Sequence, residues 1–330
     1  MSEARKPRLT TSAMIASLVE EGQRTTPAPF GHALAELGRS RPEIVGLTAD
    51  LGKYTDLHVF AAAHPDRFYQ MGMAEQVLMG AAAGFAREGF VPFVTTYAVF
   101  ASRRTYDFIA LGIAEDRLPV KIACALPGLT TGYGPSHQAT DDVAIFRAMP
   151  DLTILDPCDA WELEQAVPAV AAHPGPVYMR ILRGQVPRVL DRFGYRFEIG
   201  KAQRLRDGDD VLVVSTGLMT WRALSAAEAL ARDGIGVAVM HVATIKPLDE
   251  AAILGEVRRR PRLLVVAENH SVVGGLGEAL ALPLLRAKLS PDFLHVGLPD
   301  RFLDAGALPT LHERYGISTN ALAAAIRSRL

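Results

Sequence analysis

Short apolar runs of strand length alternate with helical stretches along most of this 330-residue chain. The runs lie at residues 44–47, 91–94, 120–123, 153–155, 177–179, 211–215, 237–241 and 263–266. Runs that are apolar at nearly every position are typical of strands buried on both faces, which occur in parallel sheets covered by helices. The pattern therefore predicts an α/β fold built on mainly parallel sheets.

The segment from Pro187 to Gly200 interrupts this alternation, because proline, glycine and charged residues are concentrated there. Such a change in composition predicts a linker between domains. Before the first domain, Met14, Leu18 and Val19 have helical spacing. A hydrophobic fraction of 49% over 330 residues is sufficient for two domains. We therefore divide the chain into an N-terminal extension, a first domain, a linker and a smaller second α/β domain, at residues 1–23, 24–190, 191–200 and 201–330.

The charge balance and the cysteines narrow the functional class. Thirty-five basic and 36 acidic residues give a formal net charge of −1, so the chain has no basic excess for nucleic acid. No apolar run reaches the roughly 18 residues of a membrane span, and no apolar segment follows Met1–Arg8, so we expect a cytoplasmic protein. Cys124 and Cys158 are the only cysteines, and we expect two reduced thiols and no metal site.

One carboxylate is placed at the start of a predicted helix. The stretch Met71–Gly84 consists mostly of small and apolar residues, and Glu75 is its only charged residue. Because alanine and glycine allow close helix packing, Glu75 is expected near a buried contact, and a buried carboxylate requires hydrogen-bond donors or a cation. The alternative is an acidic first-turn residue that complements the helix dipole.

A series of ordered motifs extends from about Arg24 to the C-terminus. The motifs are Thr48–Leu51, Met71–Gly84, Pro92–Tyr97, Tyr106–Asp107, Leu118–Ile122, Gly134–Gln138, Gly175–Arg180, Thr244–Asp249 and Gly274–Gly277. With these motifs the chain resembles the transketolase family of thiamine-diphosphate enzymes. The resemblance is to their C-terminal half, in which a pyrimidine-binding domain is followed by the transketolase C-terminal domain.

The resemblance implies roles in cofactor binding for three residues. Glu75 matches the catalytic carboxylate that holds the protonated ring nitrogen of the cofactor's aminopyrimidine, which lets the cofactor act as its own base. Tyr97 and Phe100 match the aromatic wall around the pyrimidine ring, where offset stacking is favourable. Ordinary core aromatics would have the same spacing, but the presence of Glu75 favours the cofactor interpretation.

The resemblance also implies catalytic and substrate-binding residues. His137, in the motif Gly134–Gln138, matches a transketolase histidine that hydrogen-bonds the donor sugar near the reacting carbon. A histidine can also shuttle protons near neutral pH. Tyr133 stands where sugar-using transketolases have an aspartate that contacts a donor hydroxyl, so that acceptor is lost.

Four further positions match the ligands of the donor phosphate in sugar-phosphate transketolases, namely Pro27, Tyr54, Leu126 and Arg183. Only Arg183 keeps a cation that binds phosphate well, and Tyr54 and Leu126 make the substrate path more apolar. Arg183 with Arg180 could instead bind one carboxylate or sulfonate, although arginines near a strand end are more often solvated. The expected donor is therefore not a standard sugar phosphate.

The motif that binds the cofactor diphosphate and its metal in this family is absent from the sequence. The family uses Gly-Asp-Gly followed by Asn, and such oxygen ligands suit Mg²⁺ or Ca²⁺, whereas this chain has no Gly-Asp-Gly. The nearest segment, Asp207–Asp210, is typical of a turn, and we interpret Gly274–Gly277 as a packing turn rather than an anion site. The resemblance therefore implies a separate diphosphate-binding subunit that holds the metal, in an α2β2 assembly.

These observations favour one function over two alternatives. We predict the pyrimidine-domain subunit of a two-component thiamine-diphosphate enzyme that transfers a ketol or acyl unit from a ketone or 2-oxo acid to an aldehyde. The β subunit of a 2-oxo acid dehydrogenase or decarboxylase would use the same cofactor, but Gly134–Gln138 and Thr244–Asp249 are more similar to transketolase. A non-catalytic scaffold could have kept the fold, but the presence of Glu75, Tyr97, Phe100 and His137 together argues against it.

Overall fold

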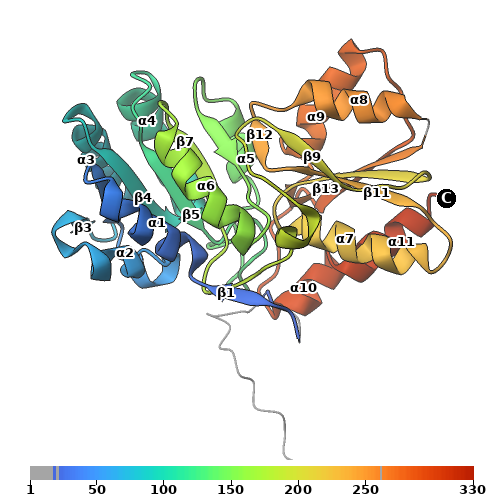
Figure 1. Ribbon diagram of the computed structural model, residues 1–330, viewed down its shortest axis with the longest axis horizontal. Helices are drawn as coiled ribbons and strands as arrows, with labels where there is room; N and C mark the ends of the chain where they lie inside the picture. The colour runs from blue at the N-terminus through green and yellow to red at the C-terminus, as the bar shows by residue number, and fades with distance from the viewer. Residues whose placement is uncertain (1–17, 20–21, 261) are drawn as a thin grey trace, which may run out of the picture.

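The computed structural model describes residues 18–19, 22–260 and 262–330. Met14 of the predicted helical segment lies outside these residues, and Leu18 and Val19 have no regular secondary structure. The described residues form two large sheets, each covered by helices (Figure 1). The predicted α/β fold with mainly parallel sheets is confirmed.

Within the described residues, the first sheet contains seven strands in the order β12-β6-β7-β5-β4-β2-β3. Their bounds are β2 Ile44–Thr48, β3 Phe68–Gln70, β4 Val91–Tyr97, β5 Lys121–Ala125, β6 Thr153–Leu155, β7 Val177–Ile181 and β12 Thr244–Lys246. The strands β2 to β7 are parallel, and β12 is antiparallel to β6. Strands β2, β5, β6 and β7 are buried along their whole length, which explains their continuous apolar runs in the sequence.

Helices connect these strands and pack in pairs, α1 against α6 and α3 against α4. Their bounds are α1 Pro29–Ser40, α2 His58–Ala63, α3 Glu75–Arg87, α4 Ala98–Ile109, α5 Asp142–Arg147 and α6 Ala160–Ala172. Helix α3 contains four alanines, and alanine has the highest helix propensity. It ends two residues before Gly89, whose φ of 88° is not helical. Glu75 is thereby the first residue of a short, well-defined helix.

A separate antiparallel pair joins the two ends of the first domain. Strand β1 (Thr25–Pro27) pairs with β8 (Gln185–Pro187), with Pro27 opposite Gln185. Single turns of 3-10 or π-helix lie at Gly52–Thr55, Pro65–Arg67, Ala110–Ala114 and Leu190–Phe193. Because Gln185 is two residues after Arg183, this pairing brings Pro27 near the backbone of Arg183.

The second sheet has the order β14-β13-β10-β11-β9, in which only the edge strand β9 is antiparallel among the described strands. Its strands are β9 Ala202–Arg206, β10 Val211–Ser215, β11 Val237–Val242, β13 Leu263–Ser271 and β14 Phe293–Leu298. Its helices are α7 Leu218–Ala231, α8 Glu250–Arg259, α9 Leu276–Arg286, α10 Leu308–Arg314 and α11 Thr319–Arg327. Helices α8 and α9 lie on one side of this sheet, and α7, α10 and α11 lie on the other (Figure 1).

Alternating side chains of the second sheet belong to two apolar clusters. Leu212 and Val214 of β10 belong to a cluster that includes residues of α8 and α9. Val211 and Val213 belong to a larger cluster that continues through the first domain. Because successive strand residues point to opposite faces, one face of this sheet carries its own core and the other carries a core shared with the first domain.

Polar contacts also join the two halves of the chain. Glu162 of α6 accepts a hydrogen bond from the His241 ring of β11 at 2.9 Å, and both side chains are fully buried. Tyr195, in the segment predicted as a linker, is buried, and its hydroxyl donates to Glu162. Strand β12, which belongs to the second half, extends the first sheet. The two halves are therefore packed against each other rather than loosely tethered.

Among the described helices, none has both the length and the hydropathy of a membrane span. Cys124 and Cys158, predicted as reduced thiols, are free cysteines, and both are buried. Burial raises the pKa of both thiols, so they stay protonated and poorly reactive near neutral pH. The segment Asp207–Asp210, predicted as a turn, is a short loop that connects β9 to β10 and bends at Asp209 and Asp210.

Candidate active site

The carboxyl ends of five adjacent parallel strands lead to the predicted site residues. Arg183 follows β7, and the loop with Leu126, Tyr133 and His137 follows β5. Tyr97 ends β4, and Phe100 comes three residues later. Tyr54 follows β2, and Glu75 follows β3. Ligands bind at this edge in open α/β sheets, because the loops that follow the strands converge there. Residues far apart in the sequence thereby share one edge of the first sheet.

Glu75 is the first residue of α3 and only 3% exposed. Its Oε1 atom accepts a hydrogen bond from Arg104 Nη1 of α4 at 2.9 Å. Arg104 is about half exposed, and sequence reasoning did not single it out. The only sequence signal was its position four residues after Phe100, which places both on one side of α4. The buried carboxylate therefore has the cation that its burial requires.

The aromatic residues at the end of β4 form a cluster beside this ion pair. The ring centroids of Tyr97 and Phe100 are 5.6 Å apart. The Arg104 guanidinium lies over the Phe100 ring at 4.0 Å from its centroid, a cation–π contact. One arginine thus contacts both the predicted carboxylate and the predicted aromatic wall.

His137 lies in the loop between β5 and α5 and closes this cluster. Its ring centroid is 5.4 Å from that of Phe100, 6.0 Å from Tyr97 and 4.9 Å from Tyr133. Its Nδ1 atom is 2.9 Å from Ser136 Oγ. Burial, and then the positive charge of Arg104, lower the pKa of His137 below its usual 6.5. The imidazole is therefore neutral at pH 7 and can accept or donate a hydrogen bond.

Arg183 and two tyrosines act electrostatically on the same cluster. Burial raises the pKa of Tyr97, the charge of Arg183 opposes this shift, and Tyr133 and Tyr54 add to it. Burial likewise raises the pKa of Tyr133, and Arg183 again opposes it. Because such effects weaken with distance, these four side chains share one neighbourhood. Tyr54 is 37% exposed and forms the more open part of it.

Leu126 directly follows β5 and is buried in the large apolar core. Its φ of 58° lies in the left-handed region, which turns the chain sharply out of the strand. Pro27 is exposed at the end of β1. Of the four predicted phosphate-contact positions, Tyr54 and Arg183 thus lie with the aromatic cluster, whereas Leu126 contributes to the core beneath it.

Arg180 does not have the role considered for it from the sequence. It lies within β7 and is only 1% exposed, and its guanidinium donates to both carboxylate oxygens of Asp142 and to Asp156 at 2.8–3.1 Å. Burial alone would lower the pKa of Arg180, but the two carboxylates raise it. The idea of a solvated or substrate-binding arginine is wrong here, because its donors are already used inside the protein.

The glycine motif Gly274–Gly277 spans the start of α9, and a carboxylate of the protein itself binds the free N–H groups there. The Glu268 carboxylate accepts hydrogen bonds from the backbone N–H groups of Leu276 and Gly277 at 2.7 and 2.9 Å. It also accepts one from His295 Nε2 at 2.7 Å. A Cβ atom at Gly275 would overlap this carboxylate. The loop therefore has the packing role predicted from the sequence.

The residues at the sheet edge fit the pyrimidine end of thiamine diphosphate. Glu75 offers a buried acceptor, and Tyr97 and Phe100 offer ring faces beside it. Throughout residues 18–19, 22–260 and 262–330, no group of three or more His, Cys, Asp or Glu side chains is placed to hold a metal ion.

Two family models match the chain, the transketolase pyrimidine-binding domain over residues 23–188 and the transketolase C-terminal domain over residues 200–322. The chain belongs to the transketolase family. Members of this family use thiamine diphosphate. An uncharacterised transketolase family protein from Sinorhizobium fredii is 67% identical over 331 residues, which cover 100% of this chain and 96% of that protein.

Other relatives divide into half-length and full-length proteins. A 6-deoxy-6-sulfo-D-fructose transketolase subunit from Clostridium is 39% identical, with 88% of this chain and 89% of that subunit covered. A 1-deoxy-D-xylulose-5-phosphate synthase from Syntrophotalea carbinolica is 35% identical over 91% of this chain, which spans only 47% of the synthase. A split-gene transketolase solved as an inactive β4 tetramer is 40% identical, with a TM-score of 0.82 over 93% of this chain and 98% of that one.

Proposed function

We propose that this chain is the pyrimidine-domain subunit of a two-component, thiamine-diphosphate-dependent transferase. A partner subunit supplies the diphosphate-binding domain and holds Mg²⁺ or Ca²⁺, and two copies of each subunit form an α2β2 assembly. The enzyme moves a ketol or acyl unit from a ketone or 2-oxo acid donor to an aldehyde. The match to nearly a whole transketolase subunit, but to only about half of a synthase, supports the split arrangement.

The observation that carries this proposal is the Glu75 carboxylate, buried at the start of α3 beside the aromatic cluster. When bound, thiamine diphosphate supplies the nucleophile for carbonyl addition. Glu75 would hold the protonated pyrimidine nitrogen, and Tyr97 and Phe100 would contact the ring. Arg104 fixes the position of the carboxylate through its hydrogen bond to Oε1.

His137 is the residue placed to act on the substrate. Its ring lies against those of Phe100, Tyr97 and Tyr133. Because its pKa is lowered, the neutral ring can donate a hydrogen bond to the donor oxygen or accept a proton from it near pH 7. Tyr133 offers a hydroxyl group, rather than a carboxylate, to the same substrate.

The charges at the site favour a donor other than a sugar phosphate. A phosphate carries close to two negative charges, and Arg183 is the only cation at the four positions that match phosphate ligands. An unpaired charge in a partly buried site is strongly unfavourable. A donor with one carboxylate or sulfonate, or with no charge, fits this site better. The similar subunit named for 6-deoxy-6-sulfo-D-fructose agrees with a sulfonated donor.

An exposed apolar face next to Glu75 supports a partner subunit. Met73 and Val77 are 82% and 58% exposed, and Gly80 and Gly84 are exposed at helical spacing from Val77 on α3. Apolar residues gathered on one exposed face indicate a docking surface, and glycines allow close approach. The inactive β4 state of the similar split-gene transketolase agrees with a chain that needs a different partner for activity.

The test is reconstitution of the purified chain with the product of a neighbouring reading frame that encodes Gly-Asp-Gly followed by Asn. With thiamine diphosphate and Mg²⁺, turnover should appear only in the mixture. The donors to compare by kcat/KM are xylulose 5-phosphate, fructose 6-phosphate, 6-deoxy-6-sulfofructose, unphosphorylated ketoses and pyruvate. Turnover by the chain alone would contradict the two-component proposal, and a sugar phosphate preferred by tenfold or more would contradict the proposed donor class.

A further inference from the structure

The loop that follows β5, residues 126–138, is held by the second domain. We call it the substrate loop, because it carries Tyr133 and His137. Its hydrogen bonds to the second domain come from β13, from α10 and from the segment that precedes α10. The loop therefore depends on residues far from it in the sequence.

Asn269 of β13 forms the first of these attachments. It is 2% exposed, and its Oδ1 atom accepts a hydrogen bond from the Leu129 N–H at 2.9 Å. Its Nδ2 atom donates to the Pro127 carbonyl at 3.4 Å. A Cβ atom at Gly128 would overlap both the backbone and the side chain of Asn269. The loop backbone and Asn269 are thus in direct contact.

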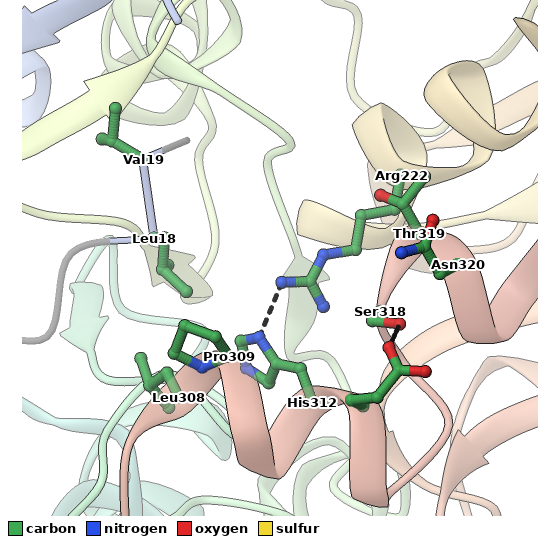
Figure 2. Close-up of a pocket in the computed structure, with 10 residues that line it drawn as sticks. Leu18, Val19, Arg222, Leu308, Pro309, His312, Ser318, Thr319 and Asn320 are labelled. Atoms are coloured by element: carbon green, nitrogen blue, oxygen red, sulfur yellow. Dashed lines mark hydrogen bonds between the residues drawn. The ribbon is translucent and has the colours of Figure 1, made fainter. Parts of the chain in front are cut away.

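His312 of α10 forms the second attachment and is 3% exposed. Its Nε2–H donates to the Leu129 carbonyl at 2.6 Å, while its Nδ1 accepts from Arg222 Nη2 at 2.7 Å. Burial, and then the charge of Arg222, lower the pKa of His312 to about 3, so the ring is neutral and keeps this one donor. Figure 2 shows the Arg222–His312 pair at a pocket of about 440 Å³. His312 stands between this pocket and the substrate loop.

The segment before α10 forms the third attachment. The Gly306 N–H donates to the Gly132 carbonyl at 3.0 Å, and a Cβ atom at Gly132 would overlap the Gly306 carbonyl. Gln138 Nε2 donates to the Asp304 carbonyl at 3.1 Å. Gly132 directly precedes Tyr133 and Gln138 directly follows His137, so these bonds bracket the two site residues.

We propose that the second domain positions the substrate loop, with Asn269 and His312 as the residues that orient Tyr133 and His137 toward the donor. Both backbone groups of Leu129 are bonded to these two side chains, so the peptide orientation at Leu129 is determined by the second domain. The domain then influences donor selection without touching the donor. The role of the loop in donor binding rests on the proposed function, whereas its attachment to the second domain does not.

The first test measures kinetics in the reconstituted enzyme. His312→Leu removes the donor to Leu129, His312→Gln keeps an N–H that can reach the same carbonyl, and Asn269→Leu removes the other attachment. Because misplacement by about 1 Å can lower a rate by about 10²-fold, we expect kcat/KM for the donor to fall roughly 10–100-fold in both leucine variants, mainly through KM. His312→Gln should recover most of this loss. The Kd of thiamine diphosphate should stay within about twofold, because Glu75, Tyr97 and Phe100 lie outside the loop.

A matched control separates positioning from loss of stability. Ile253 belongs to the apolar cluster that includes residues of α8 and α9, on the opposite side of the sheet from α10. Ile253→Ala should lower the stability of the second domain without touching the attachments of the substrate loop. It should leave kcat/KM unchanged at temperatures where it is folded. If Ile253→Ala reduces kcat/KM as much as His312→Leu does, the attachment has no specific role and the proposal is wrong.

The second test uses the full chain without any partner. The His137 imidazole is titrated by NMR and assigned by the signal that His137→Gln removes. Release of the loop should expose the ring and raise its pKa toward 6.5 in His312→Leu and Asn269→Leu, but not in Ile253→Ala or His312→Gln. If the wild-type chain shows no turnover with any partner, the proposed function fails. The titration still shows whether the second domain holds the substrate loop in place. Unchanged titration in both leucine variants would overturn the inference.

Discussion

Glu75 and Glu268 are both buried carboxylates at helix N-termini, yet their surroundings differ. Glu268 is fully buried, and its oxygens accept hydrogen bonds from two backbone N–H groups of α9 and from His295. Glu75 is bonded to Arg104, which is about half exposed. Within the described residues, the N-terminus of α9 is closed by the protein's own groups, whereas the N-terminus of α3 lies beside an exposed apolar face.

The difference indicates which carboxylate can act on a ligand. Burial alone would raise the pKa of Glu268, but the His295 hydrogen bond, the charge of His270 and the Gly277 N–H together lower it. Such a carboxylate stabilises the fold and has little capacity left for a ligand. A carboxylate whose cation is half exposed can exchange that partner for a ligand group at less cost. The predictions below test this distinction.

The largest expected effect is that of Glu75→Gln in the reconstituted enzyme. The amide keeps the shape of the side chain but removes the negative charge that stabilises a protonated pyrimidine. We expect kcat to fall by about 10²–10⁴-fold, the usual contribution of acid–base assistance. Thermal unfolding of the chain should change little. A loss of kcat below threefold, with folding and assembly intact, would return Glu75 to the alternative role of complementing the helix dipole.

Glu268→Gln should act on stability instead. In this variant one of the three donors would face an amide N–H₂ group, and a buried donor without an acceptor costs about 1–3 kcal/mol. Because the pKa of Glu268 is lowered in the folded state, its stabilisation is present above the unfolded value near 4.5 and is lost as the pH falls through the folded value. The difference between wild type and variant in urea unfolding should therefore be large at pH 7 and shrink below about pH 4.5. A constant difference from pH 7 to pH 3 would contradict this assignment.

The pH dependence of donor turnover should reflect His137. Because burial and Arg104 lower the pKa of His137 below 6.5, kcat/KM should stay level as the pH falls through 6.5. It should fall about tenfold per pH unit only below the lowered pKa, where the ring becomes protonated. The measurement is a pH–rate profile from pH 5 to 8, with His137→Asn as the control that lacks this limb. An acid limb centred above pH 6.5, or one that persists in His137→Asn, would exclude this role.

A pair of glycines gives the smallest expected effect. Gly277→Ala should destabilise the chain by about 1–3 kcal/mol, because a Cβ atom there would overlap the His295 ring. At Gly84 nothing lies within 4 Å of such an atom, so Gly84→Ala should stabilise the isolated chain by about 0.5–1 kcal/mol. If the exposed side of α3 binds the partner closely, Gly84→Ala should at the same time weaken assembly. If the wild-type chain and Gly84→Ala bind the partner with equal affinity, α3 does not form that interface.

The buried strands could be predicted from the sequence because they are apolar at nearly every position. Strand β10 occupies residues 211–215 and β6 occupies 153–155, as predicted. Strand β9, Ala202–Arg206, was missed because it lies at the sheet edge and carries charged side chains. Strand β12 has three residues and pairs with β6 of the first sheet, a long-range contact that local patterns do not contain.

The candidate site was predicted only in part, for a similar reason. Glu75 and His137 lie in motifs that resemble a known family, and the structure places them around one aromatic cluster. Arg104 was missed because a charged residue on a helix is usually solvated. His312 is 183 positions from Leu129, so its contact with the substrate loop depends on how the two domains pack. The domain boundaries at residues 190 and 200 stay a prediction.

Calorimetry with thiamine diphosphate and Mg²⁺ tests the central claim most directly. The cofactor is titrated into this chain alone, into the candidate partner alone, and into the equimolar mixture. If this chain supplies only the pyrimidine end of the site, tight Mg²⁺-dependent binding should appear only in the mixture, and Glu75→Gln should weaken it there. Tight Mg²⁺-dependent binding by the chain alone would contradict the account.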